Sequence, residues 1–373
     1  MSLPPSKKRR ICNLYSNNNN NSIPTNITEK DIYNFEEDFP TDINMNMSIH
    51  KSIQLNIDGI PFRNSHNIGS GTFSKVYKLI NKENPRDNTD ALAIKIFKSS
   101  SPYKKSAIEE INALNILKGC PFIVDIVGYF KITTNHIAIV TPFYDYNLLS
   151  YMSTYLNTTK ITYGNFMSVF VSLLNACCCM IKYGISSTDM KPENIFLNVR
   201  MNGNIEKVVL GDFSMPLYLN THQETSYNKW ICTKYYRPPE IIFQLPKPQL
   251  KNMDLWSLGC VLYELYHNSV LFHCSANDSD LEKSNENLFH MQVSVLGIPS
   301  YEYFEKYNID YSDKYIYINS DEYQKFKEPQ QEIIKQFSEI PFGSELILKY
   351  LNWDSDERPD PEFSLTYIKE RLL

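Results

Sequence analysis

The chain has 373 residues, of which 42% are hydrophobic and 21% are charged, a composition typical of globular proteins with a sizeable core. Its 37 basic residues are outnumbered by 42 acidic ones, which gives a formal net charge of −5. This balance argues against a protein whose whole surface binds nucleic acid. We therefore expect no direct nucleic-acid partner.

The chain contains eight cysteines, and no two of them have the C-x-x-C spacing of a zinc or redox site. We expect reduced, mostly buried thiols in an intracellular protein. The run from Cys177 to Cys179 stands out, but neighbours on a helix point about 100° apart and cannot converge on one metal. Core packing is the favoured interpretation of this run.

Residues 1–58 are predicted to form a disordered tail, because they contain few regularly spaced apolar positions and a run of five asparagines, Asn17–Asn21. A basic cluster, Lys7–Arg10, is typical either of a nuclear-import signal or of a solvated charge run. Both interpretations remain open, so the expected location is the nucleus or the cytoplasm.

No N-terminal stretch has the apolar run of a signal peptide. The longest apolar segment, Phe166–Ile181, is interrupted by serines and an asparagine. It predicts a buried helix and no membrane contact.

The first ordered elements are expected near Phe62. Two strands within residues 68–77 are joined by a turn that contains Gly69 and Gly71, where backbone amides can approach phosphate oxygens because no Cβ intervenes. Taken alone, two glycines in a hairpin are more typical of a structural turn. The next strand, residues 91–97, is apolar apart from Lys95, a residue that is costly to bury without a partner.

Residues 103–118 have helical spacing of their apolar positions. Strands at 125–132 and 136–141 complete a small first lobe, which is expected to have five strands and one helix. The second lobe is predicted to be mostly helical. Residues 163–183 form a long amphipathic segment that ends at Gly184. The apolar pieces 195–197 and 208–210 predict a hairpin through Asn202-Gly203.

The most informative stretch is Asp189-Met190-Lys191-Pro192-Glu193-Asn194. A carboxylate and an amide five positions apart, with a lysine between them, can receive a hydroxyl proton, screen phosphate charge and ligate a metal. The stretch resembles the catalytic loop of eukaryotic protein kinases, H-R-D-L-K-P-E-N. Ser187 and Thr188 stand at the His and Arg positions.

Further motifs extend this resemblance over about residues 60–373. The glycine turn is similar to the kinase G-x-G-x-x-G-x-V loop, with Ser74 at the third glycine, and Asp212-Phe213-Ser214 stands where kinases have D-F-G. Residues 233–243 resemble the segment that closes the activation loop. By resemblance, Glu240 should pair with Arg358, and Asp254 should brace the backbone of the catalytic loop.

The resemblance implies an α+β, bilobal protein kinase fold, with a small β-rich lobe at about 59–143 and a larger helical lobe at about 144–373. It also implies ATP and Mg²⁺. Asp189 would orient a hydroxyl and accept its proton, Lys191 would stabilise charge on the transferred group, and Asn194 and Asp212 would hold Mg²⁺. The implied ATP-binding residues are Ile68, Gly69, Gly71, Val76, Ala93, Lys95, Glu110 (the partner of Lys95, in preference to Glu109), Thr141, Phe143 and Tyr144.

Within the family, the chain is similar to the group of cyclin-dependent, MAP and dual-specificity-Tyr-regulated kinases, and most similar to its pre-mRNA-splicing branch. Ser74, the segment Tyr263–Tyr266 and a catalytic aspartate without a preceding arginine support this placement. This placement implies a monomeric Ser/Thr kinase that acts on proteins. By resemblance, Arg237 indicates substrates that are either Pro-directed or of the SR type. Trp230 stands where such kinases often have a phosphorylated Tyr, so we expect activity that needs no loop phosphate.

Two rival functions are compatible with parts of the sequence. A pseudokinase, acting as a nucleotide-binding or scaffold protein, is favoured by Ser74, Ser187, Thr188 and by Ser214, which replaces a glycine with greater conformational freedom. The complete charged set favours an active enzyme. A small-molecule phosphotransferase is disfavoured by Pro239-Glu240 and the segment 254–259.

Overall fold

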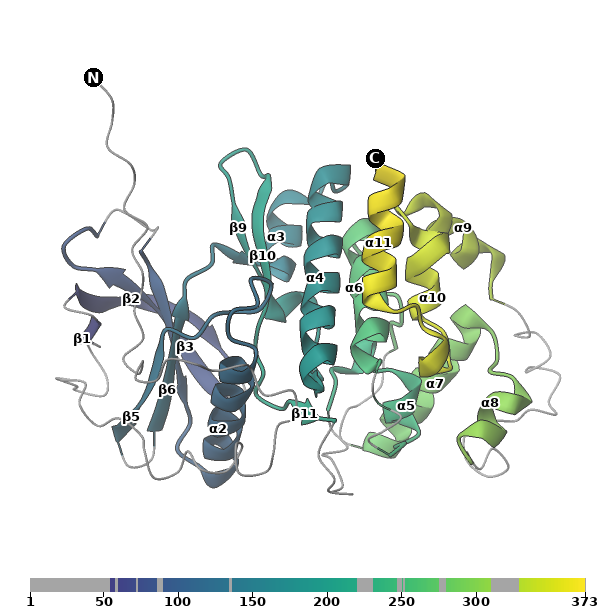
Figure 1. Ribbon diagram of the computed structural model, residues 1–373, viewed down its shortest axis with the longest axis horizontal. Helices are drawn as coiled ribbons and strands as arrows, with labels where there is room; N and C mark the ends of the chain where they lie inside the picture. The colour runs from purple at the N-terminus through teal and green to yellow at the C-terminus, as the bar shows by residue number, and fades with distance from the viewer. Residues whose placement is uncertain are drawn as a thin grey trace. The chain divides into compact units, whose positions relative to one another are not determined.

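The computed structural model describes residues 54–57, 60–71, 73–85, 90–133, 136–219, 231–246, 250, 252–274, 280–309 and 329–372. The chain divides into two compact units (Figure 1). Unit 1 comprises the chain up to Lys118 together with Asp125–Phe143, and unit 2 comprises Gly119–Val124 together with Tyr144–Leu373. The mixed α+β organisation predicted from the sequence is confirmed.

Unit 1 is built on a six-stranded sheet in the order β1-β2-β3-β4-β6-β5, with every neighbouring pair antiparallel. Helix α2, Ser101–Ile116, packs against β4 and β6. The core includes Leu79 and Ile94, whose side chains are fully buried. The strands are β1 (Gln54–Ile57), β2 (Ile60–Ser70), β3 (Ser74–Asn81), β4 (Leu92–Phe97), β5 (Gly128–Thr133) and β6 (His136–Pro142).

Strand β1 corrects two expectations, that this part has five strands and that the disordered tail extends to residue 58. Leu55 is only 3% exposed and packs in the same core as Phe62. The alternation of Leu55 and Ile57 with polar residues was the signal that could have revealed the strand. Residues 1–53, including the basic cluster and the asparagine run, lie outside the described residues.

Unit 2 is mainly helical (Figure 1). Its sheets are small: one has the order β10-β9-β7, and the other pairs β11 with β8. The strands are β7 (Tyr146–Asn147), β8 (Ile185–Ser186), β9 (Ile195–Val199), β10 (Ile205–Leu210) and β11 (Leu217–Tyr218). The α-helices are α3 (Leu148–Tyr155), α4 (Tyr163–Tyr183), α5 (Pro239–Ile242), α6 (Met253–His267), α7 (Leu281–Leu296), α8 (Tyr301–Lys306), α9 (Gln331–Glu339), α10 (Leu348–Tyr350) and α11 (Pro361–Leu372).

Helix α4 has the bounds that the sequence predicts. Thr162 caps its start by accepting a hydrogen bond from the Asn165 amide, and Gly184 ends it in the left-handed conformation, φ 62°. By length and composition alone α4 could cross a membrane. Its apolar side chains, however, pack against α6, α11 and β10, and Phe166 and Phe170 are fully buried. This position agrees with the predicted buried helix.

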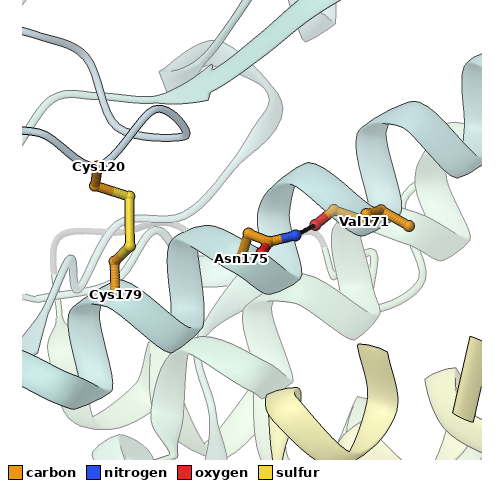
Figure 2. The surroundings of a disulfide bond; sticks show 4 residues. All are labelled: Cys120, Val171, Asn175 and Cys179. Carbon is orange, nitrogen blue, oxygen red and sulfur yellow. Dashed lines mark hydrogen bonds between the residues drawn. A yellow bond between two sulfur atoms is a disulfide. The ribbon is translucent and has the colours of Figure 1, made fainter. Parts of the chain in front are cut away.

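Cys120 and Cys179 form a disulfide bond across a Cα–Cα distance of 6.6 Å (Figure 2). The expectation that all eight cysteines are reduced thiols is therefore wrong for these two. Cys178, next to one of them, is a free and half-buried thiol, and burial raises its pKa to about 11. The pairing joins segments 59 residues apart, which is why spacing along the chain could not reveal it.

The disulfide fastens the short segment Gly119–Val124 to α4. This segment also pairs with the end of β10, because the Val124 amide donates to the Leu210 carbonyl and the Leu210 amide donates to the Phe122 carbonyl, both at 2.9 Å. The covalent bond therefore supports the backbone that leads to Asp212.

We predict that reduction of this disulfide destabilises the protein. Closing a loop of 59 residues restricts the unfolded chain, and by the chain-entropy model this is worth about 4 kcal/mol. Urea unfolding with and without dithiothreitol measures the difference. Cys179→Ser should behave like the reduced protein, whereas Cys178→Ser, the matched control, should change the unfolding free energy by about 1 kcal/mol or less. Equal midpoints with and without reductant would contradict the prediction.

Candidate active site

The carboxylate of Asp189 is the centre of a hydrogen-bonded cluster within unit 2. Its Oδ1 accepts from the Thr233 amide at 3.1 Å and from the Thr233 hydroxyl at 2.6 Å. Its Oδ2 lies 2.7 Å from Lys191 Nζ and 3.1 Å from Asn194 Nδ2. Lys191 Nζ also donates to the Thr233 hydroxyl at 2.7 Å. The cluster fixes the carboxylate, yet the Asp189 side chain keeps 20% exposure, so a small group from solvent can reach it.

Asp254, in the first turn of α6, holds the start of this loop. Its carboxylate accepts from the Ser187 amide at 3.2 Å and from the Ser187 hydroxyl at 2.7 Å. Burial raises the pKa of Asp254, and the bonds from Ser187 and Ser186 act in the opposite direction. The predicted bracing of the loop backbone is confirmed, and the bond from the Ser187 hydroxyl is an addition that the motif did not predict.

Asp212 is the second residue after β10, and the structure brings its segment to Asn194. The Gly211 amide donates to the Asn194 carbonyl at 2.9 Å. A Cβ on Gly211 would lie 2.7 Å from Val124 Cγ2 and 2.8 Å from Phe196 Cε2, so only glycine fits there. Asp212 itself is left-handed, φ 58°.

Ser214 does not occupy a glycine-like conformation. The described residues other than glycine that have a positive φ do not include Ser214. Its side chain is buried. The backbone strain in this segment therefore falls on Asp212 and not on the serine that replaces the usual glycine. Ser214 is accordingly a weaker reason for expecting a pseudokinase than the motif indicated.

The donor atoms near Asp212 suit a hard cation. Mg²⁺ prefers oxygen ligands and is usually held by one or two carboxylates together with substrate phosphates. Asn194 donates both of its hydrogen bonds to Asp189 through its amide nitrogen, which leaves its amide oxygen as the atom for a cation. No cluster of three or more His, Cys, Asp or Glu side chains that could hold a metal occurs within the described part of the chain.

In unit 1, Lys95 and Glu110 form a close ion pair, with Lys95 Nζ 2.6 Å from Glu110 Oε2. Glu110 is buried on α2, 4% exposed. Glu109 faces another way and lies 3.7 Å from Lys105. The choice of Glu110 over Glu109 agrees with this geometry, and the half-buried lysine of β4 has an oppositely charged partner.

The other predicted ATP-binding residues of unit 1 lie on neighbouring strands. Ala93 pairs with Thr141, and Val76 pairs with both Lys95 and Gly69. Gly69 and Gly71 lie in uncrowded surroundings, since a Cβ on Gly69 would make only ordinary contacts and one on Gly71 would meet no described atom within 4 Å. Packing among the described residues therefore does not explain these glycines.

The remaining residues of this group flank the glycines or follow β6. Ile68 is 40% exposed, which is high for a large apolar side chain. The Phe143 amide donates to the Ala91 carbonyl at 3.0 Å. Tyr144 belongs to unit 2, where its ring stacks on Phe196. Thr72, in the glycine turn, lies outside the described residues.

Arg237 fixes a backbone carbonyl close to the Asp189 cluster. Its Nε and Nη2 donate to the Cys232 carbonyl at 3.3 and 2.9 Å, and its Nη1 donates to Asn285 at 2.6 Å. Cys232 is left-handed, φ 63°, and directly precedes Thr233. The sequence pointed to Arg237 but not to Cys232, because nothing in a sequence marks a left-handed cysteine.

The predicted pair of Glu240 and Arg358 is confirmed. Both side chains are buried, and Arg358 Nη1 and Nη2 donate to the two Glu240 oxygens at 2.6 and 2.8 Å. Arg358 also donates to the Asn252 carbonyl at 3.0 Å. The pair joins segments 118 residues apart.

Comparisons with known proteins agree with this arrangement. The family model described as "Protein kinase domain" matches residues 62–365. The chain is 29% identical over 215 residues to the "Probable CTD kinase subunit alpha homolog" of Encephalitozoon cuniculi, covering 58% of this chain and 60% of that protein. It is 26% identical over 318 residues to the "Putative serine/threonine-protein kinase L673" of Acanthamoeba polyphaga mimivirus, covering 83% and 51%. It is 25% identical over 332 residues to the "Serine/threonine-protein kinase prp4" of Schizosaccharomyces pombe, covering 81% and 65%. The matches thus span less than two thirds of each relative's length.

We predict that breaking the buried ion pair costs far more stability than breaking an exposed one. Arg358→Met leaves the Glu240 charge buried without its partner, and such losses are about 3–5 kcal/mol. Arg200→Met is the matched control, because Arg200 and Glu206 pair at 3.1 Å with 64% and 56% exposure, and exposed pairs contribute about 1 kcal/mol or less. Urea unfolding measures both. Similar losses in the two variants would show that the buried pair has no special weight.

Proposed function

We propose a function that starts from one fact: the chain belongs to the protein kinase domain family. A protein kinase domain uses ATP, typically with Mg²⁺, and acts on proteins. Within that frame, we infer that this chain is a Ser/Thr kinase that transfers the ATP γ-phosphoryl group to protein hydroxyls. The observation that supports it most strongly is the cluster in which Lys191, Asn194 and Thr233 surround the Asp189 carboxylate.

Asp189 would act on the hydroxyl that attacks the phosphoryl group. The Thr233 hydroxyl already donates to Asp189 Oδ1 at 2.6 Å, so an aliphatic alcohol can reach this oxygen at hydrogen-bond distance. A substrate hydroxyl bonded in the same way would be oriented by the carboxylate, which would accept its proton. Lys191 lies within reach of the same oxygens and would stabilise negative charge on the group in transfer.

The other charged residues would bind the donor. Lys95 would hold the α- and β-phosphates, because its pairing with Glu110 fixes the direction of the ammonium group. Asn194 and Asp212 would hold Mg²⁺ through oxygen atoms. The ion, when bound, supplies positive charge that neutralises the phosphates. Phosphoryl transfer needs little covalent chemistry from the protein, so alignment and charge account for most of the catalysis.

The contact between Arg237 and Cys232 supports a preference for proline after the target residue. The Cys232 carbonyl is turned to Arg237 by the left-handed backbone and so is not an acceptor for a bound peptide. It directly precedes Thr233, which contacts Asp189. A peptide residue with an N–H at this point would lose a partner, whereas proline has no N–H to satisfy.

The proposal extends to the cellular location of the protein and to the pathway in which it acts. Resemblance to the pre-mRNA-splicing branch supports a nuclear kinase related to splicing. The relatives named CTD kinase subunit alpha homolog and prp4 lend support at 29% and 25% identity. The alternative function, a pseudokinase that binds nucleotide or acts as a scaffold, is favoured by one specific observation, the replacement of the His and Arg positions by Ser187 and Thr188.

We predict that Asp189→Asn and Lys95→Ala each lose at least about 100-fold in phosphoryl transfer while the protein stays folded. Glu110→Gln should also lose activity because it removes the carboxylate charge that pairs with Lys95, whereas Glu109→Gln, its neighbour on the same helix, should not. Radiolabel transfer from ATP to a generic basic protein measures activity, and thermal unfolding checks the fold. Substantial turnover by Asp189→Asn would reject the mechanism, and ATP binding without any transfer by the unaltered protein would favour the pseudokinase.

We also predict a preference for peptides with Ser-Pro over otherwise identical peptides with Ser-Ala. An unpaired N–H costs about 1–3 kcal/mol, which corresponds to a kcat/KM ratio of roughly 5 to 150. Asn285→Ala loosens Arg237 and should lower this ratio without abolishing transfer. Equal kcat/KM values for the two peptides would contradict the proposed role of the Cys232 carbonyl.

A further inference from the structure

Thr188, the residue before Asp189, has an unusual backbone. Its φ is 61°, a left-handed conformation that is rare for a β-branched residue because the branched Cβ crowds the carbonyl oxygen. Such strain persists only where the surroundings determine it, and it is typical of functional sites. The Thr188 side chain is almost fully buried, so tertiary contacts and not solvent fix this conformation.

The contacts of Thr188 show what the strain secures. Its hydroxyl donates to the Met215 carbonyl at 2.6 Å, and its amide donates to the Ser186 hydroxyl at 3.3 Å. Met215 is the third residue after Asp212. The side chain thus links the catalytic loop directly to the segment that follows the proposed metal-binding aspartate.

The same segment is held at two further places. Before Asp212, the Gly211 amide bonds to the Asn194 carbonyl. After Met215, Leu217 pairs with Ser186 in the two strands β11 and β8, and the Leu219 amide donates to the Gly184 carbonyl at 2.7 Å. Several described hydrogen bonds join the catalytic loop to the segment that follows Asp212. Of these, the bond from the Thr188 hydroxyl is the nearest to Asp212.

A hydroxyl bonded to a backbone carbonyl works without any modification of the protein. In the resembling kinases an arginine stands at this position, and a guanidinium there can pair with a phosphate on the activation loop. Thr188 is uncharged and cannot attract a phosphate. Its acceptor, the Met215 carbonyl, is present in every state of the chain.

We propose that Thr188 is a positioning residue whose hydroxyl holds the segment after Asp212 in place, so that phosphoryl transfer does not depend on a loop phosphate. The proposal rests on the proposed kinase function. It deepens that function by naming how this site is kept in its working arrangement. It also gives a physical reason for the threonine, which the family pattern leaves unexplained.

The test compares Thr188→Val, which keeps the shape but loses the hydroxyl, with Thr188→Ser, which keeps the hydroxyl. Thr188→Val loses the 2.6 Å bond to the Met215 carbonyl, so we expect it to lose about tenfold in kcat. Because Asp212 is then less well placed, the Mg²⁺ concentration for half-maximal activity should rise. Thr188→Ser should restore both values to within about twofold of the unaltered protein.

A matched control separates this role from a general loss of folded protein. Thr154 also donates its hydroxyl to a backbone carbonyl, that of Ser150, at 2.7 Å within α3. Thr154→Val should leave both kcat and the Mg²⁺ requirement unchanged. A fall in kcat for Thr188→Val without a shift in the Mg²⁺ requirement would point to a purely structural role and overturn the proposal.

Two further measurements keep the outcome decisive. Phosphatase treatment of the unaltered full-length protein should leave activity intact, and loss of activity would overturn the proposal. Hydrogen exchange at the amides of Leu217 and Leu219 should be faster in Thr188→Val, and unchanged exchange would overturn it as well. Exchange does not require turnover, so if the unaltered protein transfers no phosphate, the kinase function fails while the hydrogen-exchange result still decides the role of Thr188.

Discussion

The buried carboxylate of Asp254 is the constraint on which the catalytic loop depends. A charge removed from water must be compensated by hydrogen bonds, or its burial is prohibitively costly. Both the amide and the hydroxyl of Ser187 supply such bonds, which fixes the backbone one residue before Thr188 and two before Asp189. The serine also shows how the chain adapts to the absence of a histidine at this position, because its short side chain turns back onto the same carboxylate.

From this fixed point the order of the site extends in both directions. The backbone is left-handed at Thr188 and at Asp212. Beside these two residues the loops are joined by the Thr188 hydroxyl, which bonds to the Met215 carbonyl, and by the Gly211 amide, which bonds to the Asn194 carbonyl. Before Asp212, the support continues through the end of β10 to the segment that Cys120 ties to α4. The position of one acidic side chain thus depends on backbone bonds, a glycine too crowded to be replaced, and a covalent link outside the loop.

Much of the architecture could be predicted from the sequence because it follows from the spacing of apolar residues and from turn residues that are close together in the chain. Helix α4 follows from apolar spacing and the glycine that ends it, and the hairpin of β9 and β10 follows from Asn202-Gly203, with Gly203 at φ 82°. The pairs formed by Glu240 with Arg358 and by Lys95 with Glu110 could be expected only through resemblance, since no local rule connects residues so far apart. The roles of these residues in catalysis stay predictions.

The features that were missed have a common physical cause. Strand β1 is too short for its alternation to stand out, and it is stabilised by the core that Leu55 joins. The Cys120–Cys179 bond and the contact that accompanies the left-handed backbone of Thr188 join distant segments. The left-handed backbone of Cys232 accompanies a contact with Arg237, five residues further on, and no local sequence rule marks it. The type of a residue determines only how unfavourable such a backbone conformation is. The contacts in the folded protein determine whether the residue adopts it.

The segment Gly119–Val124 has one more implication, for how the protein can be divided. It belongs to unit 2, although in the chain it lies between the two stretches of unit 1. A recombinant fragment that started at Tyr144 would therefore lack the backbone groups that pair with Leu210, the side chain of Val124 against Gly211, and the sulfur partner of Cys179. The helical part of this protein is discontinuous in sequence, and a faithful dissection would have to graft those six residues back onto it.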